Sequence, residues 1–78
     1  MLNFGKSDVV TFGQGYVGVV EEIFESAKQG TYLVKVRVFV RPPEGAYQVG
    51  TLQLFELSEV RRQGNLYADT SLAYMLID

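Results

Sequence analysis

Two long β-rich runs joined by a short polar turn constrain the fold of this chain more than any other feature. The runs are YVGVVEEIFE, residues 16–25, and TYLVKVRVFVR, residues 31–41, and the turn between them is SAKQG. Five-residue hairpin connections often contain a glycine, and Pro42-Pro43 cannot donate hydrogen bonds to a strand ladder. The sequence therefore predicts a long, twisted β-hairpin that ends at Arg41, of the kind that curls into a small barrel.

The second run alternates between apolar and mixed residues, so its two faces differ in character. We expect one face to be buried and the other to be mostly exposed to solvent. If the turn centres on Lys28, Glu21 lies opposite Lys35, and a slip of one residue would exchange the faces. The expected buried face is Val34, Val36, Val38 and Val40, and the exposed face is Leu33, Lys35, Arg37, Phe39 and Arg41.

Shorter strand and turn signals precede the hairpin and lie inside it. Asp8–Phe12 reads as a first strand, and the two glycines of Gly13-Gln-Gly15 are typical of a tight turn with positive φ. Gly18 would weaken a regular ladder, which predicts a bulge or a sharp bend at this position.

The C-terminal part of the chain has weaker signals. Thr51–Leu57 reads as a fourth strand, Arg61–Asn65 as a polar turn and Leu66–Ala68 as a short edge strand. Tyr74–Ile77 is interpreted as a final strand, with a helical turn over residues 71–77 as the alternative. Five or six short antiparallel strands with regular turns predict an all-β fold, a small SH3-like barrel. In the fourth strand we expect Leu52, Leu54 and Phe55 to be buried.

Composition limits the class of protein. The 78 residues have room for one domain, spanning residues 1–78, and an apolar share of 47% is ordinary for a packed core. The chain has no cysteine, which favours a cytoplasmic, reducing location. No signal peptide is evident, and no apolar run reaches the roughly 20 residues that cross a bilayer, so no membrane contact is expected. The net charge of −2 argues against a chain built mainly to neutralise phosphate.

The residues that usually carry out catalysis are missing. The chain has neither histidine nor cysteine, and no serine lies in a Gly-x-Ser-x-Gly elbow. Glu21 and Glu22 are adjacent strand residues, so we expect them to point to opposite faces. Residues 13–18 match G-x-G-x-x-G but run into a strand instead of a helix, which excludes a dinucleotide site of that type. We therefore expect no enzyme activity, no cofactor and no metal.

A basic strand face supports nucleic-acid binding as an alternative function. Lys35, Arg37 and Arg41 share a face with Phe39, and a basic strand with an aromatic ring can hold single strands by stacking. Residues 8–23 also resemble the opening of KOW-type barrels of transcription factors. The negative total charge and the facing Glu21 make this the less favoured reading.

Aromatic residues at turns favour protein binding. Aromatic residues make up 13% of the chain, and Tyr16 and Tyr47 lie at predicted turns, where tyrosine suits protein interfaces. The alternative is that these rings pack across the mouth of the barrel. We place the partner-binding surface on Tyr16, Tyr47 and Arg41, for a peptide or a protein partner, and an open strand edge would also permit a homodimer.

Residues 16–44 resemble the core of the bromo-adjacent homology (BAH) domain, which has strands like Y-x-G-x-I-E-E-I-x-E and V-R-V-R-W-F-Y-R-P-E-E. The residues LFELS at 54–58 look like that family's E-L-F-x-S segment. The resemblance implies an SH3-like barrel with a protein-binding role. The tryptophan and tyrosine of the family are Val38 and Val40 here, so an aromatic cage for methylated lysine is not expected.

Overall fold

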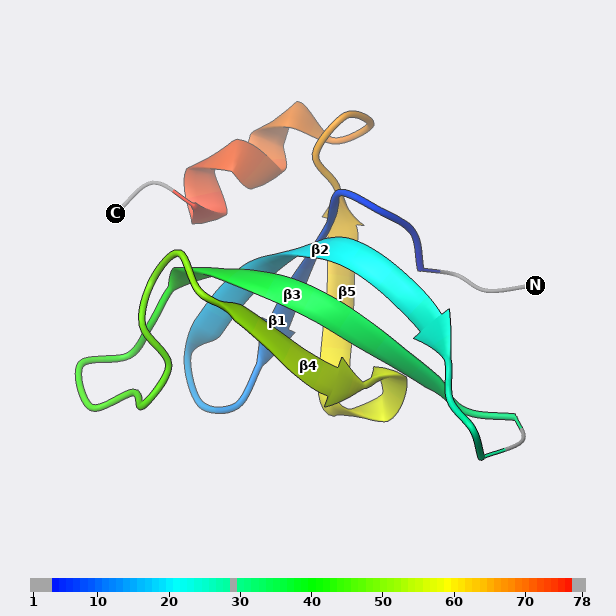
Figure 1. Cartoon of the computed structure of the whole chain (residues 1–78). Helices are drawn as coiled ribbons and strands as arrows, with labels where there is room; N and C mark the ends of the chain where they lie inside the picture. The colour runs from blue at the N-terminus through cyan, green and yellow to red at the C-terminus, as the bar shows by residue number, and fades with distance from the viewer. Residues whose placement is uncertain (1–3, 29, 77–78) are drawn as a thin grey trace.

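The fold is all-β, as the sequence predicts. The computed structural model describes residues 4–28 and 30–76, in which five antiparallel strands form one sheet with the order β4-β3-β2-β1-β5 (Figure 1). The strands are β1 (Asp8–Phe12), β2 (Tyr16–Glu25), β3 (Tyr32–Val40), β4 (Leu52–Glu56) and β5 (Val60–Asn65), and two short 3₁₀ segments are η1 (Leu57–Glu59) and η2 (Thr70–Met75).

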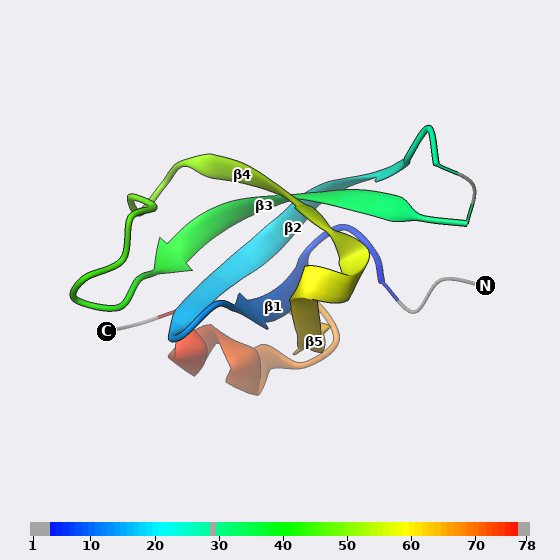
Figure 2. The same ribbon diagram turned by 90° about the horizontal axis from the view of Figure 1, so that it is seen from below.

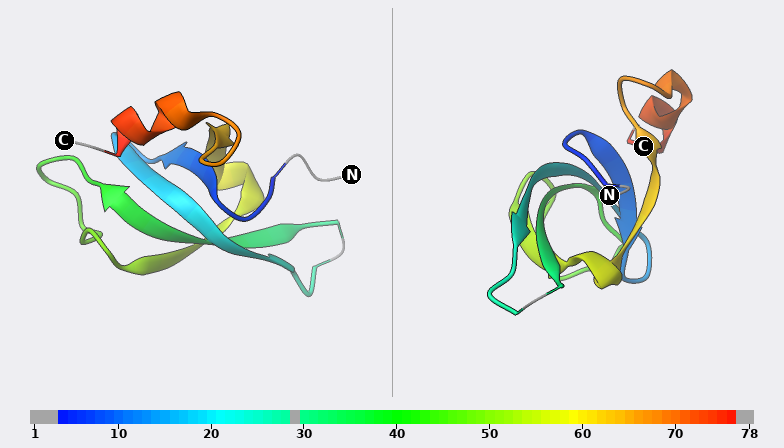
Figure 3. Two further views of the ribbon diagram at one scale, coloured as in Figure 1. Left: turned by 90° about the horizontal axis from the view of Figure 1, so that it is seen from above. Right: turned by 90° about the vertical axis from the view of Figure 1, so that its right-hand side faces the viewer.

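The sheet is strongly curled but remains open between its two outer strands. β4 and β5 are the edges of the hydrogen-bonded order, and η1 carries the chain from one to the other (Figure 2). Seen end on, the strands wrap around a common interior, and η2 lies on the outside of the curl (Figure 3). The structure is therefore a small antiparallel sheet that encloses one core.

Valine side chains on the inner face of the curled sheet form the centre of the core. Val34, Val36 and Val38 are fully buried, which confirms the predicted inner face of β3 for these three residues. Val40, the fourth residue predicted on that face, is only partly buried and does not belong to the core cluster. Burying a valine side chain contributes roughly 1.5–3 kcal/mol, so this stripe is a major source of stability. The other buried members of the cluster are Val10, Phe12, Tyr16, Val20 and Val60.

The outer face of β1 and β2 also has a buried patch. Val9 and Val19 are paired across these strands and are buried, although neither belongs to the inner cluster. Leu72 of η2 lies against Gly64, the residue of β5 that pairs with Val9, and a Cβ at Gly64 would meet it at 2.5 Å. η2 therefore covers β5 on this side of the sheet. A strand over Tyr74–Ile77 is wrong for Tyr74 and Met75, which lie in η2, and for Leu76, which follows η2 in a turn. Ile77 is outside the described residues.

The predicted bulge at Gly18 is confirmed. The pairing of β2 with β3 shifts between Val17 and Gly18, and it shifts again between Val20 and Glu22. The second bulge corrects the predicted hairpin register. Val20 pairs with Val36 as expected, but beyond the bulge Lys35 pairs with Glu22 and not with Glu21.

β4 and β5 differ from what the sequence predicts. Leu52 and Leu54 are 42% and 55% exposed, and only Phe55 of the expected buried set packs against the core. Residues 61–65, predicted as a polar turn, form most of β5, and residues 66–68 form a turn and not a strand. β5 is an edge strand with one face exposed to solvent, and such a strand needs few apolar residues. Its sequence therefore lacks the alternation of apolar and polar residues by which strands are recognised.

Candidate functional site

Four aromatic rings meet at one end of the curled sheet. Phe12 and Tyr16 flank the turn between β1 and β2, and their rings are stacked with centroids 5.0 Å apart. Tyr47 comes from the loop between β3 and β4, and its ring lies 5.2 Å from that of Tyr16 and 5.7 Å from that of Phe55. Such pairs add roughly 0.5–1.5 kcal/mol beyond the burial of their area. The rings therefore close the end of the core and attach the loop to it.

Hydrogen bonds fix the same loop. The Tyr16 hydroxyl accepts a bond of 3.2 Å from the N–H of Tyr47. Arg41 Nη1 donates to the carbonyl of Gly45 at 2.7 Å, and the Gly45 N–H donates to the carbonyl of Pro42 at 2.9 Å. Gly45 also has no room for a side chain, because a Cβ there would lie 2.5 Å from the Tyr16 hydroxyl oxygen. The start of the loop is thus held in one conformation against β2.

A pocket of about 620 Å³ lies between this loop and the turn that joins β1 to β2. Tyr16, the two prolines and Ala46 provide apolar surface, and Gln14 and Glu44 provide polar groups. We call it the proline–tyrosine pocket, and its lining is Gln14, Tyr16, Pro42, Pro43, Glu44, Gly45 and Ala46. A smaller pocket of about 380 Å³ lies at the opposite end of β2 and β3, beside Phe4, Tyr32 and Leu57, and none of the predicted site residues lines it.

The three residues predicted to bind a partner come together, but two of them are not exposed as expected. Tyr16 is only 8% exposed, and Tyr47 is half-buried against the core cluster, so the alternative of rings packed across the end of the sheet describes both. Arg41 is exposed, with its guanidinium held by the loop. The sequence placed Tyr16 and Tyr47 at turns but did not indicate that they contact each other. Accordingly, Tyr16 forms a wall of the pocket, and Tyr47 stabilises the loop.

The basic face of β3 is largely neutralised by acidic residues of β2. Lys35 Nζ lies 3.6 Å from Glu22 Oε1, and Arg37 Nε donates to Glu21 Oε2 at 2.9 Å. Arg37 Nη1 also donates to the carbonyl of Gly50 at 2.7 Å. Both carboxylates thus reach the same face of the sheet, contrary to the expectation for adjacent strand residues, because the bulge after Val20 breaks the alternation.

Phe39 and Arg41, the two remaining residues of the predicted nucleic-acid face, lie in different surroundings. Phe39 is 39% exposed on the outer face of β3. Arg41, beyond the end of the strand, donates to Gly45 and belongs to the loop. The face therefore presents one exposed ring beside cations that already have partners within the chain.

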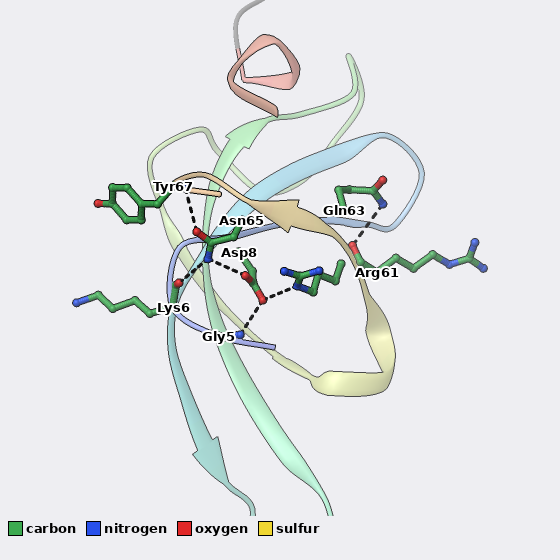
Figure 4. Close-up of polar contacts among 8 residues, drawn as sticks. Gly5, Lys6, Asp8, Arg61, Gln63, Asn65 and Tyr67 are labelled. Atoms are coloured by element: carbon green, nitrogen blue, oxygen red, sulfur yellow. Dashed lines mark hydrogen bonds and ion pairs between the residues drawn. The ribbon is translucent and has the colours of Figure 1, made fainter. Parts of the chain in front are cut away.

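The sequence did not reveal a buried acidic residue, Asp8, that joins β1 to β5 (Figure 4). Its side chain is 3% exposed and accepts hydrogen bonds from Gly5 N–H at 2.7 Å, Arg62 Nε at 2.9 Å and Asn65 Nδ2 at 2.8 Å. A buried carboxylate is tolerated when its charge is paired and its lone pairs are satisfied. This cluster consequently has a structural role, tying the chain before β1 to the edge strand.

Within residues 4–28 and 30–76, no three acidic side chains gather closely enough to hold a metal ion. None of the helical segments in this described part of the chain is long and apolar enough to cross a membrane. Comparisons with protein-family models, curated proteins and solved structures gave no match to this chain.

The packing of Tyr47 predicts a loss of stability when its ring is removed. Aromatic truncation in a core costs roughly 3–5 kcal/mol, so for this half-exposed ring we expect Tyr47→Ala to cost about 2 kcal/mol. That corresponds to a fall in melting temperature of about 10 °C, measured by circular dichroism. Tyr67→Ala is the matched control, because Tyr67 is 86% exposed, and it should melt like the parent. Equal melting of the two variants would show that Tyr47 does not hold the loop.

Proposed function

We propose that this domain is a non-catalytic protein-interaction module that binds an extended peptide segment of a partner protein in the proline–tyrosine pocket. The observation that carries the proposal is a concave surface whose walls are already fixed by the loop hydrogen bonds and the aromatic contacts described above. Binding to a preorganised surface avoids the entropic cost of ordering a loop, which otherwise reduces affinity.

The chemistry of the pocket suits a peptide better than a small charged ligand. Tyr16 and Pro42 form apolar walls, and tyrosine is among the residues enriched at protein interfaces. Glu44 and Gln14 offer oxygen acceptors at the same pocket. We infer that an apolar side chain of the peptide enters the pocket and that backbone N–H groups or a basic side chain of the peptide bind these acceptors.

The resemblance of residues 16–44 to the BAH core belongs to the same proposal. Kinship with SH3-like barrels would account for an open, curled sheet whose binding loops project from one end, since small all-β scaffolds hold recognition loops in place. The absence of cysteine from the chain supports an intracellular location for this interaction.

Selection of peptides followed by calorimetry tests the proposal. Peptides from a random phage-displayed library would be selected on the immobilised domain and titrated against the parent, Ala46→Arg and Ala27→Arg. Ala46 is an exposed pocket residue, so the arginine should fill the pocket and weaken binding at least about tenfold, a typical effect at an interface hot spot. Ala27 is exposed in the distant turn between β2 and β3, and the same change there should leave affinity unchanged.

Melting curves of both variants would establish that each is folded. Failure to select any peptide would contradict the proposal, as would peptides that bind Ala46→Arg and the parent equally well.

Binding of single-stranded nucleic acid is tested separately, by fluorescence anisotropy with a labelled oligonucleotide. Because Lys35 and Arg37 are paired with glutamates, we expect dissociation constants of roughly tens of micromolar or weaker at physiological salt, as for non-specific contacts. Phe39→Ala should then change little. Tight binding that weakens steeply with salt and is lost in Phe39→Ala would instead favour nucleic acid as the ligand.

A further inference from the structure

The two edges of the sheet differ in how they are protected from pairing with another strand. β5 carries Arg61 and Arg62, its pairing with β1 is interrupted by a bulge, and η2 packs against it. Charged residues, bulges and covering segments are the usual devices that block an edge. β4 has none of them between residues 52 and 55, and its register with β3 is regular. Of the two edges of the sheet, the β4 edge is therefore the one that residues 4–28 and 30–76 leave open to a further strand.

The backbone of β4 is oriented for such pairing. Val38 N–H donates to the Thr51 carbonyl at 2.9 Å, and from there the antiparallel pattern alternates along the strand. Gln53 and Phe55 are consequently the residues that bond to β3, whereas the N–H and C=O groups of Leu52 and Leu54 point away from it. The Glu56 N–H also points away, and it donates to Glu59 Oε1 at 2.7 Å.

The side chains beside this edge are apolar and exposed. Leu52 and Leu54 stand on the outer face at 42% and 55% exposure, opposite Arg37 and Lys35 of β3. Phe39 lies on the same face at 39% exposure. Contiguous exposed apolar residues on a small protein indicate an interaction surface.

We propose that this edge binds the β4 strand of a second copy of the chain, antiparallel, around a two-fold axis at Gln53. In this register Leu52 of each copy faces Leu54 of the other, so the four leucines cover one another on the outer face. A symmetric pair also uses the same surface twice, which is the commonest arrangement among homo-oligomers. The product is one sheet that continues from the first copy into the second.

The positions of acidic and basic side chains favour a second copy of the chain in this register. With Gln53 at the axis, Glu56 of the second copy lies opposite Gly50, whose carbonyl already holds the Arg37 guanidinium at 2.7 Å. An acidic side chain is thereby brought next to a basic one at both ends of the interface. A register shifted to place the axis at Leu54 would pair Leu54 with Leu54 but set each Leu52 opposite Glu56, so one leucine pair would remain instead of two. The self-pairing surface is distinct from the proline–tyrosine pocket, which is lined by Gln14, Tyr16 and residues 42–46.

Sedimentation equilibrium of the whole chain from micromolar to millimolar concentration tests this inference. The parent should shift with concentration from 8.7 kDa towards twice that mass. Leu54→Lys places a charge at the open edge and should weaken dimerisation at least about tenfold. Tyr67→Lys is the matched control, because Tyr67 is more exposed than Leu54 and lies after β5, and it should dimerise like the parent.

Amide hydrogen exchange of the parent gives a second readout, in which Leu52 and Leu54 N–H groups should become protected as concentration rises. A parent that stays monomeric at millimolar concentration would overturn the inference. A dimer that is insensitive to Leu54→Lys, or equally weakened by Tyr67→Lys, would overturn it as well.

Discussion

The inner face of β2 carries a glycine between two large side chains, and the packing of the whole sheet depends on the space that this glycine leaves. Gly18 lies between Tyr16 and Val20, both of which are buried in the core cluster. A Cβ at Gly18 would lie 2.7 Å from the Arg37 carbonyl oxygen and 3.2 Å from the ring of Phe12, and it would overlap Val36. β2 and β3 therefore approach one another more closely than any residue with a side chain would allow.

The aromatic contacts and the loop between β3 and β4 are connected to this close approach. The Phe12 ring occupies part of the space over Gly18 and stacks on Tyr16, which in turn binds the backbone of the loop through its hydroxyl. The loop is fixed by these contacts, and the proline–tyrosine pocket is the hollow between the loop and the first turn. The strand order leaves β4 at an open edge of the same sheet, next to the strand that packs on Gly18.

Local sequence patterns predicted the hairpin well, because alternation and turn residues act over a few positions. The inner valines of β3, the bulge at Gly18 and the tight first turn were all evident from such patterns, and the positive φ angles of Gly13 and Gly15 agree with them. The second bulge was not evident, since nothing in VVEEIF marks the place where an extra residue enters the ladder. Because of that bulge, Lys35 pairs with Glu22 instead of Glu21, and Glu21 forms its ion pair with Arg37.

Local sequence patterns could not predict contacts between residues that lie far apart in the chain. Tyr47 and Tyr16 are 31 positions apart, and Asp8 bonds Arg62 and Asn65 across 54 and 57 positions. The leucines of β4 were assigned to the core on hydrophobicity alone, yet the alternation places Gln53 and Phe55 on the inner face. The exposed leucines of β4 and the buried Tyr16 do not follow the simple rule that apolar residues are buried and residues at turns are exposed. The proposed functions rest on these two features.

Thermal melting of Gly18→Ala beside Gly5→Ala tests the dependence of the fold on the β2 bend most directly. A Cβ at Gly5 would meet nothing within 4 Å, so that variant should melt like the parent. Gly18→Ala forces β2 away from β3, and overpacking of this kind costs roughly 1–3 kcal/mol or more. We therefore predict that Gly18→Ala melts at least about 10 °C lower and loses near-ultraviolet dichroism of the stacked tyrosine. Equal melting temperatures and spectra for the two alanine variants would contradict the account.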